Sequence, residues 1–199
     1  MPVSAAQIKE LRELTGAGVL DCRKTLEATN GDLEQAAELL RERGLAAAAK
    51  RADREMRNGV VELYSHGEGR VGVMVEVNCE TDFVARTKEF RAFAHELCLQ
   101  VAAGAPTYVD VKDVPADVLD HEKQAAMRLA REEGKPEAVM EKIVQGRLEK
   151  YYEQACLLRQ PYVRDDARRV SELLQEMIAN TGENISVRRI ARWAVGEEM

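Results

Sequence analysis

The sequence predicts an α+β fold, in which a helical bundle precedes a body that holds a small three-stranded antiparallel sheet. Helical spacing of apolar residues through residues 4–43 predicts the bundle. Alternating valines in RVGVMVEVN, residues 70–78, predict a strand with one buried face. ISVRRIARW, residues 185–193, contains β-branched residues in loose alternation and supplies a third strand.

The N-terminal bundle is predicted to contain three short helices. The first begins after Ser4 and the third after Asp32, both good N-caps, and Gly44 ends the third. Their apolar positions are Ile8, Leu11 and Leu14, then Val19, Leu20, Cys22 and Leu26, then Leu33, Ala36, Ala37 and Leu40. So small a core is marginal alone and is typical of a recognition module. We assign residues 1–45 to this module and 46–58 to an exposed helical connector.

The body, residues 59–199, is expected to open with a β-hairpin around the turn HGEG at 66–69. A helix over about 83–102 follows, with one apolar face formed by Phe90, Phe93, Ala94, Leu97 and Val101. Two longer helices predict an arm at about 117–158. A last helix at 166–180 leads into the third strand, with Ile185, Val187, Ala191 and Trp193 on one side.

The composition restricts the class of partner and the compartment. The formal net charge is −6, and an acidic chain is a poor general binder of nucleic acid, because phosphate contacts need Lys and Arg. The four cysteines form no CxxC pair and indicate thiols of a reducing compartment. The sequence shows neither a signal-peptide core nor an apolar run of membrane-spanning length, so we expect a cytoplasmic protein without membrane contact.

No set of residues has the spacing of a known catalytic or metal centre. His95 and Cys98 lie three residues apart, but zinc needs two further ligands, and a surface histidine beside a core cysteine explains the pair. Cys79 is followed by Glu80 and Asp82, whose charges oppose a reactive thiolate. The sequence has no GxxxxGK[ST] motif and is not itself a P-loop hydrolase. We expect a binding protein without cofactor or metal, not an enzyme.

The junction TDFV, residues 81–84, lies where the valine strand ends and the next helix begins. From the residues alone, Asp82 is best explained as a helix N-cap and Phe83 as a core residue.

Four blocks of the chain resemble the elongation factor Ts family. They occur in the family's order and cover almost the whole chain: LRELTGAGVLDCRKTLEATNGDLEQAAELL at 11–40, RVGVMVEVNCETDFVART at 70–87, RLEKYYEQACLLRQPYVRDD at 147–166 and GENISVRRIARW at 182–193. The resemblance implies a guanine-nucleotide exchange factor that acts on elongation factor Tu during translation elongation.

The resemblance also implies the site residues. It implies that the bundle is a ubiquitin-associated-type (UBA-like) module that docks on the GTPase, for which Arg12, Val19 and Leu20 are candidate contacts beside the alternative of packing within the module. It implies that the motif displacing magnesium from the GDP site is Thr81, Asp82, Phe83 and Val84. Asp82 could pair with a donor of the partner or repel the phosphate side, and the sequence leaves both roles open.

Longer members of the family carry two similar sheet subdomains, whereas this chain has strand patterns for one. Either one subdomain suffices, or two chains supply both surfaces, and the family's short form implies a homodimer. Three alternatives to exchange remain: a UBA-like helical adaptor, an enzyme that uses Cys79 or the His95/Cys98 pair, and an RNA-binding translation protein. The adaptor leaves Phe83 without a role, and the charge balance disfavours RNA.

Overall fold

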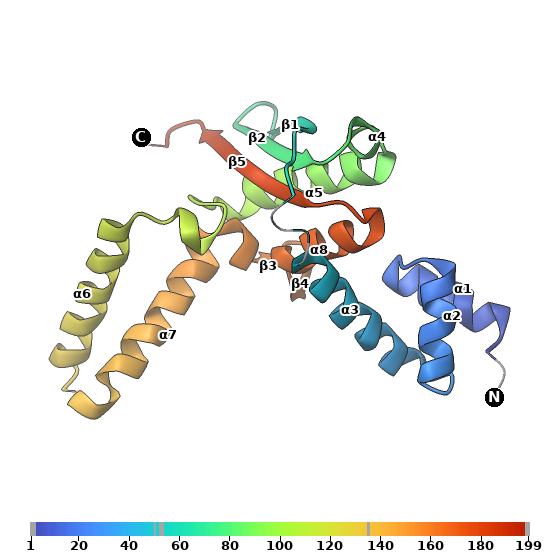
Figure 1. Ribbon diagram of the computed structural model, residues 1–199. Helices are drawn as coiled ribbons and strands as arrows, with labels where there is room; N and C mark the ends of the chain where they lie inside the picture. Colours follow the sequence, from blue (N-terminus) through green and yellow to red (C-terminus); the bar gives the residue numbers. More distant parts are fainter. Residues whose placement is uncertain (1–2, 50, 52–53, 135, 198–199) are drawn as a thin grey trace. The chain divides into compact units, whose positions relative to one another are not determined.

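The computed structural model describes residues 3–49, 51, 54–134 and 136–197, with only the backbone for 45–49 (Figure 1). Its helices are α1 (Ala5–Thr15), α2 (Val19–Ala28), α3 (Leu33–Ala49), α4 (Asp82–Ala85), α5 (Lys88–Gly104), α6 (Ala116–Glu132), α7 (Glu137–Ala155) and α8 (Val170–Thr181). Its strands are β1 (Asn58–His66), β2 (Val71–Cys79), β3 (Pro161–Tyr162), β4 (Asp165–Arg169) and β5 (Ile185–Ala194). Helices combined with a small antiparallel sheet confirm the predicted α+β class.

The chain forms two compact units. The first contains Met1–Val60, Val77–Phe93 and Glu172–Ser186, and therefore the bundle, α4 and most of α8. The second contains Val61–Glu76, Ala94–Ser171 and Val187–Met199, and therefore α6, α7 and the β3–β4 hairpin. The three strands of the main sheet and α5 contribute residues to both units.

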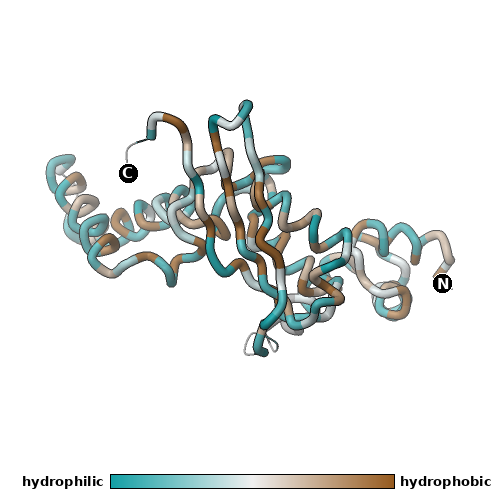
Figure 2. The backbone as a smooth tube through the Cα atoms, turned by 90° about the horizontal axis from the view of Figure 1, so that it is seen from above, coloured by the Kyte–Doolittle hydropathy of each residue, from teal (hydrophilic) through white to brown (hydrophobic). Residues whose placement is uncertain are grey.

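The main sheet has the strand order β1–β2–β5, so the predicted third strand pairs with the second strand of the hairpin (Figure 2). Val73, Val75 and Val77 of β2 are buried while Met74 is exposed, which confirms the predicted valine face. β1 approaches β2 so closely at Gly59 that a Cβ atom there would lie 2.2 Å from the carbonyl oxygen of Val77.

The bundle of the first unit has the predicted caps. The Ser4 Oγ atom accepts the Gln7 N–H at 3.2 Å, and an Asp32 carboxylate oxygen accepts the Gln35 N–H at 2.9 Å. The three helices pack around the buried side chains of Leu11, Cys22, Leu26 and Ala36. Leu14, Val19 and Leu20 are exposed, although the periodicity assigned them to the apolar stripes, because they flank the turn between α1 and α2 outside this core.

The third helix of the bundle does not end at Gly44, contrary to the prediction, but continues to Ala49. The segment LAAAA that follows Gly44 consists of strong helix formers, and these outweigh the roughly 1 kcal/mol that one glycine costs a helix. The predicted helical connector, residues 46–58, is therefore helical at its start and non-helical at 54–57. Its residues 50 and 52–53 lie outside the described residues.

In the second unit, α6 and α7 pack against each other as a helical hairpin over the residues that the sequence predicts to form an arm (Figure 1). Ala126, Ala130 and Val144 are the buried residues of this pair of helices.

The last predicted helix begins later than expected, because residues 166–169 belong to β4 and α8 starts at Val170. β3 and β4 form a short antiparallel pair, in which Tyr162 lies opposite Asp165. Glu96 of α5 holds this hairpin: its Oε2 atom accepts the Tyr162 hydroxyl at 2.6 Å and the Arg164 Nε–H at 2.6 Å. These long-range contacts override the local helical pattern.

The predicted face of β5 is correct at its start and wrong at its end. Ile185 and Val187 are buried, but Trp193 is 58% exposed. The alternation of buried and exposed residues along β5 is interrupted where Arg188 and Arg189 are both exposed. The residues that follow therefore face the opposite side of the sheet from the one predicted. Arg192 then points toward α5, where its Nε–H donates to the Ala102 carbonyl oxygen at 3.4 Å.

Candidate functional site

Thr81, and not Asp82, is the N-cap of α4. Thr81 has extended backbone angles, φ −123° and ψ 155°, and its Oγ1 atom accepts the Val84 N–H at 3.3 Å. Asp82 is the first residue of the helix, and its carboxylate pairs with the Arg86 guanidinium one turn later, at 3.0 Å. The observed N-cap therefore lies one residue before the predicted one, because Thr81 is the last residue with extended backbone angles before the helix.

Phe83 is 80% exposed, so the core role expected from its position is wrong. The predicted continuous helix over 83–102 is divided: α4 ends at Ala85, and Thr87 Oγ1 accepts the Phe90 N–H at 3.2 Å to begin α5. This division turns Phe83 outward while Ala85 of the same turn is buried. Val84 is half-buried.

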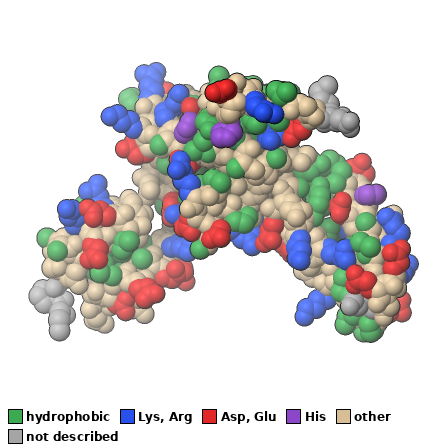
Figure 3. All heavy atoms as spheres, turned by 180° about the vertical axis from the view of Figure 1, so that it is seen from behind, with side chains coloured by type: hydrophobic (Ala, Val, Ile, Leu, Met, Phe, Trp, Pro, Cys, Tyr) green, Lys and Arg blue, Asp and Glu red, His purple; other side chains and the backbone are tan. Residues whose placement is uncertain are grey.

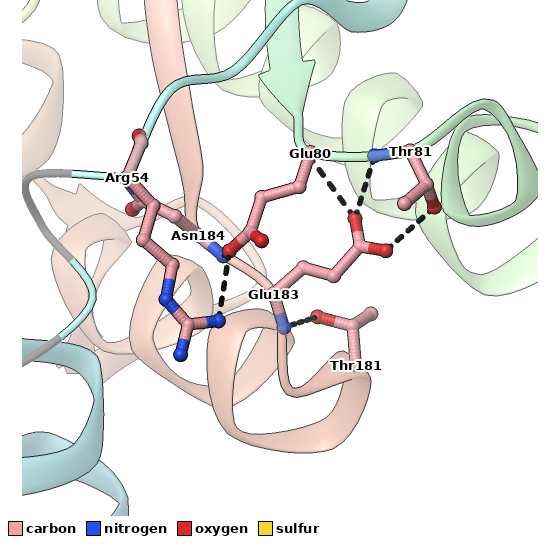
Figure 4. A network of polar contacts seen from close by, with 6 residues as sticks. All are labelled: Arg54, Glu80, Thr81, Thr181, Glu183 and Asn184. Carbon is pink, nitrogen blue, oxygen red and sulfur yellow. Dashed lines mark hydrogen bonds and ion pairs between the residues drawn. The ribbon is translucent and has the colours of Figure 1, made fainter.

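Glu183 anchors the residues that precede α4 (Figure 4). Its Oε2 atom accepts the backbone N–H groups of Glu80 and Thr81, both at 3.1 Å, and its Oε1 atom accepts the Thr81 hydroxyl at 2.6 Å. Glu183 lies in the loop between α8 and β5, far from Thr81 in the chain but in the same compact unit. One carboxylate thus satisfies both N–H groups between the end of β2 and the start of α4.

Glu80 holds the Glu183 loop in return. Its Oε1 atom accepts the Asn184 N–H at 2.6 Å and lies 3.4 Å from the Arg54 guanidinium. The Asn184 side chain donates to the Arg54 carbonyl oxygen at 3.0 Å, and Asn58 donates to the Glu80 carbonyl oxygen at 2.8 Å. Three segments of the first unit therefore meet at the base of α4 (Figure 4).

Sequence reasoning missed this network. The signal available was GEN, residues 182–184, a polar run directly before a predicted strand. Because this strand pairs with the valine strand, its preceding residues were candidates to meet the end of that strand. The pairing that brings them together is tertiary information, and a single sequence does not contain it.

An open hollow of about 530 Å³ lies beside α4 in the first unit. Asp82, Arg86 and Arg91 contribute charged side chains to its lining, and Gly59 and Val60 contribute the start of β1. The exposed ring of Phe83 therefore stands on a helix that borders a polar surface depression.

The thiols that could serve an enzyme are buried. Burial and the neighbouring Glu183 carboxylate raise the pKa of Cys79 to about 11, and its Sγ atom donates to the Thr81 carbonyl oxygen at 3.1 Å. Burial and Glu62 raise the pKa of Cys98 to about 12. Both shifts disfavour the nucleophilic thiolate. Within the described residues, no cluster of three or more His, Cys, Asp or Glu side chains could hold a metal.

The candidate contacts of the bundle all reach the surface. Val19 and Leu20 are exposed in the first turn of α2, and Arg12 is exposed on α1. Leu14, which sequence reasoning placed in the core, adds a fourth exposed side chain near the same turn. On the face shown in Figure 3, basic and acidic side chains are interspersed.

None of the described helices is both long enough and apolar enough to cross a membrane. The chain is an α+β protein with a three-helix module and with an exposed Phe83 ring at a strand–helix junction that is held by hydrogen bonds. The model of the family "Elongation factor TS" matches residues 5–197.

Curated relatives agree with this match. The chain is 56% identical to elongation factor Ts of Caldanaerobacter subterraneus subsp. tengcongensis over 195 residues, which cover 98% of each chain. It is 51% identical to the protein of the same name from Coprothermobacter proteolyticus over 197 residues, 99% of this chain and 100% of the relative. It is 54% identical to that of Moorella thermoacetica, over 98% of this chain and 96% of the relative. The chain belongs to the elongation factor Ts family and is a translation elongation factor by this membership.

Proposed function

We propose that the chain is a guanine-nucleotide exchange factor of the cytoplasm, which binds elongation factor Tu carrying GDP and promotes GDP release so that GTP can bind. The observation that carries the proposal is the exposed Phe83 ring on a helix whose backbone is fixed by Thr81 and Glu183. Membership of the elongation factor Ts family supports the choice of partner. The chain performs no covalent chemistry in this scheme.

The proposed mechanism uses the reciprocity of binding. A factor that weakens GDP binding is itself weakened by GDP to the same degree, so it binds best to a partner whose nucleotide site is deformed. Magnesium neutralises phosphate charge in such sites, and displacing its ligands removes much of the support for the diphosphate. In this scheme Phe83 enters the partner only in the deformed state.

The size of the effect follows from the ring. Burying a phenylalanine contributes roughly 1.5–3 kcal/mol, and about 1.4 kcal/mol corresponds to a factor of ten in an equilibrium constant. If that free energy is gained only in the deformed state of the partner, Phe83 alone lowers the affinity of the partner for GDP about ten- to hundredfold. Asp82, half-exposed beside the ring, brings a negative charge to the same place.

The bundle supplies affinity in this proposal. Val19 and Leu20 are exposed apolar side chains on one turn of α2, and Arg12 is exposed on α1. Replacing Leu20 by Asp should raise the concentration of the chain needed for half-maximal exchange and leave the maximal rate unchanged. A fall in the maximal rate at saturation would remove the bundle from this role.

We propose further that two copies pair through the open sheet face, which we define as Val61, Leu63, Met74 and Trp193 of the second unit. All four side chains are exposed, Leu63 at 66%. Their neighbours Glu62 and Tyr64 turn to the opposite side, where they contact His95 of α5. A homodimer would cover this apolar face and would supply two copies of the Phe83 junction.

The exchange proposal is tested by loading elongation factor Tu with a fluorescent GDP and following its release in excess unlabelled GDP. The chain should accelerate release at amounts far below those of the partner, because an exchange factor is reused. A UBA-like adaptor without exchange activity would bind the partner and leave the release rate unchanged, and this result would overturn the proposal.

A further inference from the structure

We infer that Glu183 is the positioning residue of the Phe83 junction, and the inference rests on the proposed exchange function. Glu183 acts on the ring through Thr81, to which its carboxylate is hydrogen-bonded. Its carboxylate makes three hydrogen bonds to the two residues that precede α4, at 3.1, 3.1 and 2.6 Å.

The shortest of these hydrogen bonds, from the Thr81 hydroxyl to Glu183, orients Thr81 as the N-cap of α4. An ionised carboxylate only accepts hydrogen bonds, so the Thr81 hydroxyl must donate its proton to Glu183. The hydroxyl oxygen then presents its lone pairs to the Val84 N–H, which it accepts at 3.3 Å. Glu183 therefore sets the rotamer of the N-cap, and the N-cap sets the start of the helix that carries Phe83.

The two N–H groups need this carboxylate for another reason. β2 ends at Cys79 and α4 begins at Asp82, so neither a ladder nor a helix supplies acceptors for the N–H groups of Glu80 and Thr81. Half-buried donors without an acceptor destabilise the conformation that contains them. Without Glu183, the segment would gain freedom at the base of α4.

The Glu183 loop is itself held in place. The Glu183 N–H donates to Thr181 Oγ1 at 3.3 Å, and the Thr181 hydroxyl donates to the Met177 carbonyl oxygen of α8 at 2.8 Å. Glu80 accepts the next N–H, that of Asn184, at 2.6 Å. Each of the two glutamates thus accepts backbone N–H groups from the segment of the other (Figure 4).

Phe83 needs such support because its ring is 80% exposed and gains little from packing within the chain. Its direction depends on the backbone of α4, a helix of one turn that does not form alone. A junction ordered in advance binds a partner without the entropy cost of ordering it at that moment. Loss of Glu183 should therefore lower exchange even when Phe83 is present.

The test uses Glu183→Ala, Phe83→Ala and the double variant in the GDP-release assay. Glu183→Ala should lower kcat/KM for release by about tenfold or more, a size known for small misplacements of functional groups. In the Phe83→Ala background the same substitution should add little, because it acts through the ring. If the two substitutions lower the release rate independently, so that their factors multiply in the double variant, the inference is overturned. An unchanged rate in Glu183→Ala would also overturn it.

A second measurement does not involve the partner. Amide hydrogen exchange of the isolated chain should show loss of protection at Glu80, Thr81 and Val84 in Glu183→Ala, with core amides such as that of Val75 unaffected. Unchanged protection at these three amides would overturn the positioning role even if GDP release falls. If the parent chain does not accelerate GDP release from elongation factor Tu, the proposed function fails. The protection of the three amides still decides whether Glu183 positions the junction.

Glu183→Gln serves as the second variant should the alanine variant fail to fold. Its amide oxygen can accept the two N–H groups, but its NH₂ group forces the Thr81 hydroxyl to accept and not donate. Protection at Glu80 and Thr81 should therefore survive. The Thr81 oxygen would then have to accept from both the Gln NH₂ group and the Val84 N–H, which weakens the cap, so protection at Val84 should fall together with GDP release. Full activity with full protection at Val84 would contradict the role assigned to the carboxylate.

Discussion

Phe83 and Phe90 lie two helical turns apart in the chain, and one ring is 80% exposed while the other is fully buried. The break between α4 and α5 at Arg86 and Thr87 separates them. A continuous helix would have placed both rings on one face, which is the arrangement that the sequence pattern predicts. Because of the break, Phe83 is exposed at the surface while Phe90 packs in the core.

The two phenylalanines should respond oppositely to truncation. Phe83→Ala should change the free energy of unfolding by no more than about 0.5 kcal/mol, as for other surface substitutions. Phe90→Ala should lower it by about 3–5 kcal/mol, because a buried ring leaves a cavity. Urea denaturation of both variants measures the difference, and a large loss in Phe83→Ala would show that the ring packs in solution.

Gly59 should tolerate no side chain. Its φ is +153°, and a Cβ atom would lie 2.2 Å from the Val77 carbonyl oxygen, which is backbone and cannot move aside. Gly59→Ala should therefore lower the free energy of unfolding by about 2 kcal/mol or more. Gly72→Ala in β2, where nothing lies within 4 Å of the added Cβ, is the matched control and should be close to neutral. Equal melting temperatures for the two variants would contradict the close approach of β1 to β2.

The buried thiols predict a loss of stability at high pH. The folded-state pKa is raised to about 11 for Cys79 and about 12 for Cys98, above the ordinary value of 9.0. A raised pKa means that the folded chain holds the proton more tightly, so this stability is complete below pH 9 and is lost as the pH rises toward 11–12. Denaturation at pH 7 and pH 10.5 should show it, and a Cys79→Ala/Cys98→Ala variant should lose less stability over the same interval.

The open sheet face should determine the oligomeric state. Leu63→Glu places a charge in the apolar patch and should convert the dimer mass seen by light scattering to the monomer mass. Leu129→Glu, at a 42% exposed position of α6, is the control and should leave the mass unchanged. A parent chain that is already monomeric at working concentration would remove the dimer proposal.

Much of the fold could be predicted from local patterns. The caps at Ser4 and Asp32 and the alternation of the β2 valines appear in the structure as predicted, because each depends on neighbours in the chain. The sides of β5 and the β3–β4 hairpin could not be predicted, since a change in alternation and the contacts of Glu96 determine them.

The candidate site likewise has a part that the sequence indicates and a part that only the fold brings together. The resemblance to a family pointed to Thr81, Asp82, Phe83 and Val84, and the structure shows them in one turn with the ring outward. Their anchor, Glu183, lies 102 residues from Thr81, and only the pairing of β2 with β5 brings it there.

The most direct measurement is the release of fluorescent GDP from elongation factor Tu with the parent chain and with Phe83→Ala. Val163→Ala, which truncates a 50% exposed apolar side chain of the second unit, is the matched control. Phe83→Ala should remain folded and lower the release rate about ten- to hundredfold, while Val163→Ala should match the parent. A folded Phe83→Ala variant that accelerates GDP release as fast as the parent would contradict the role proposed for Phe83.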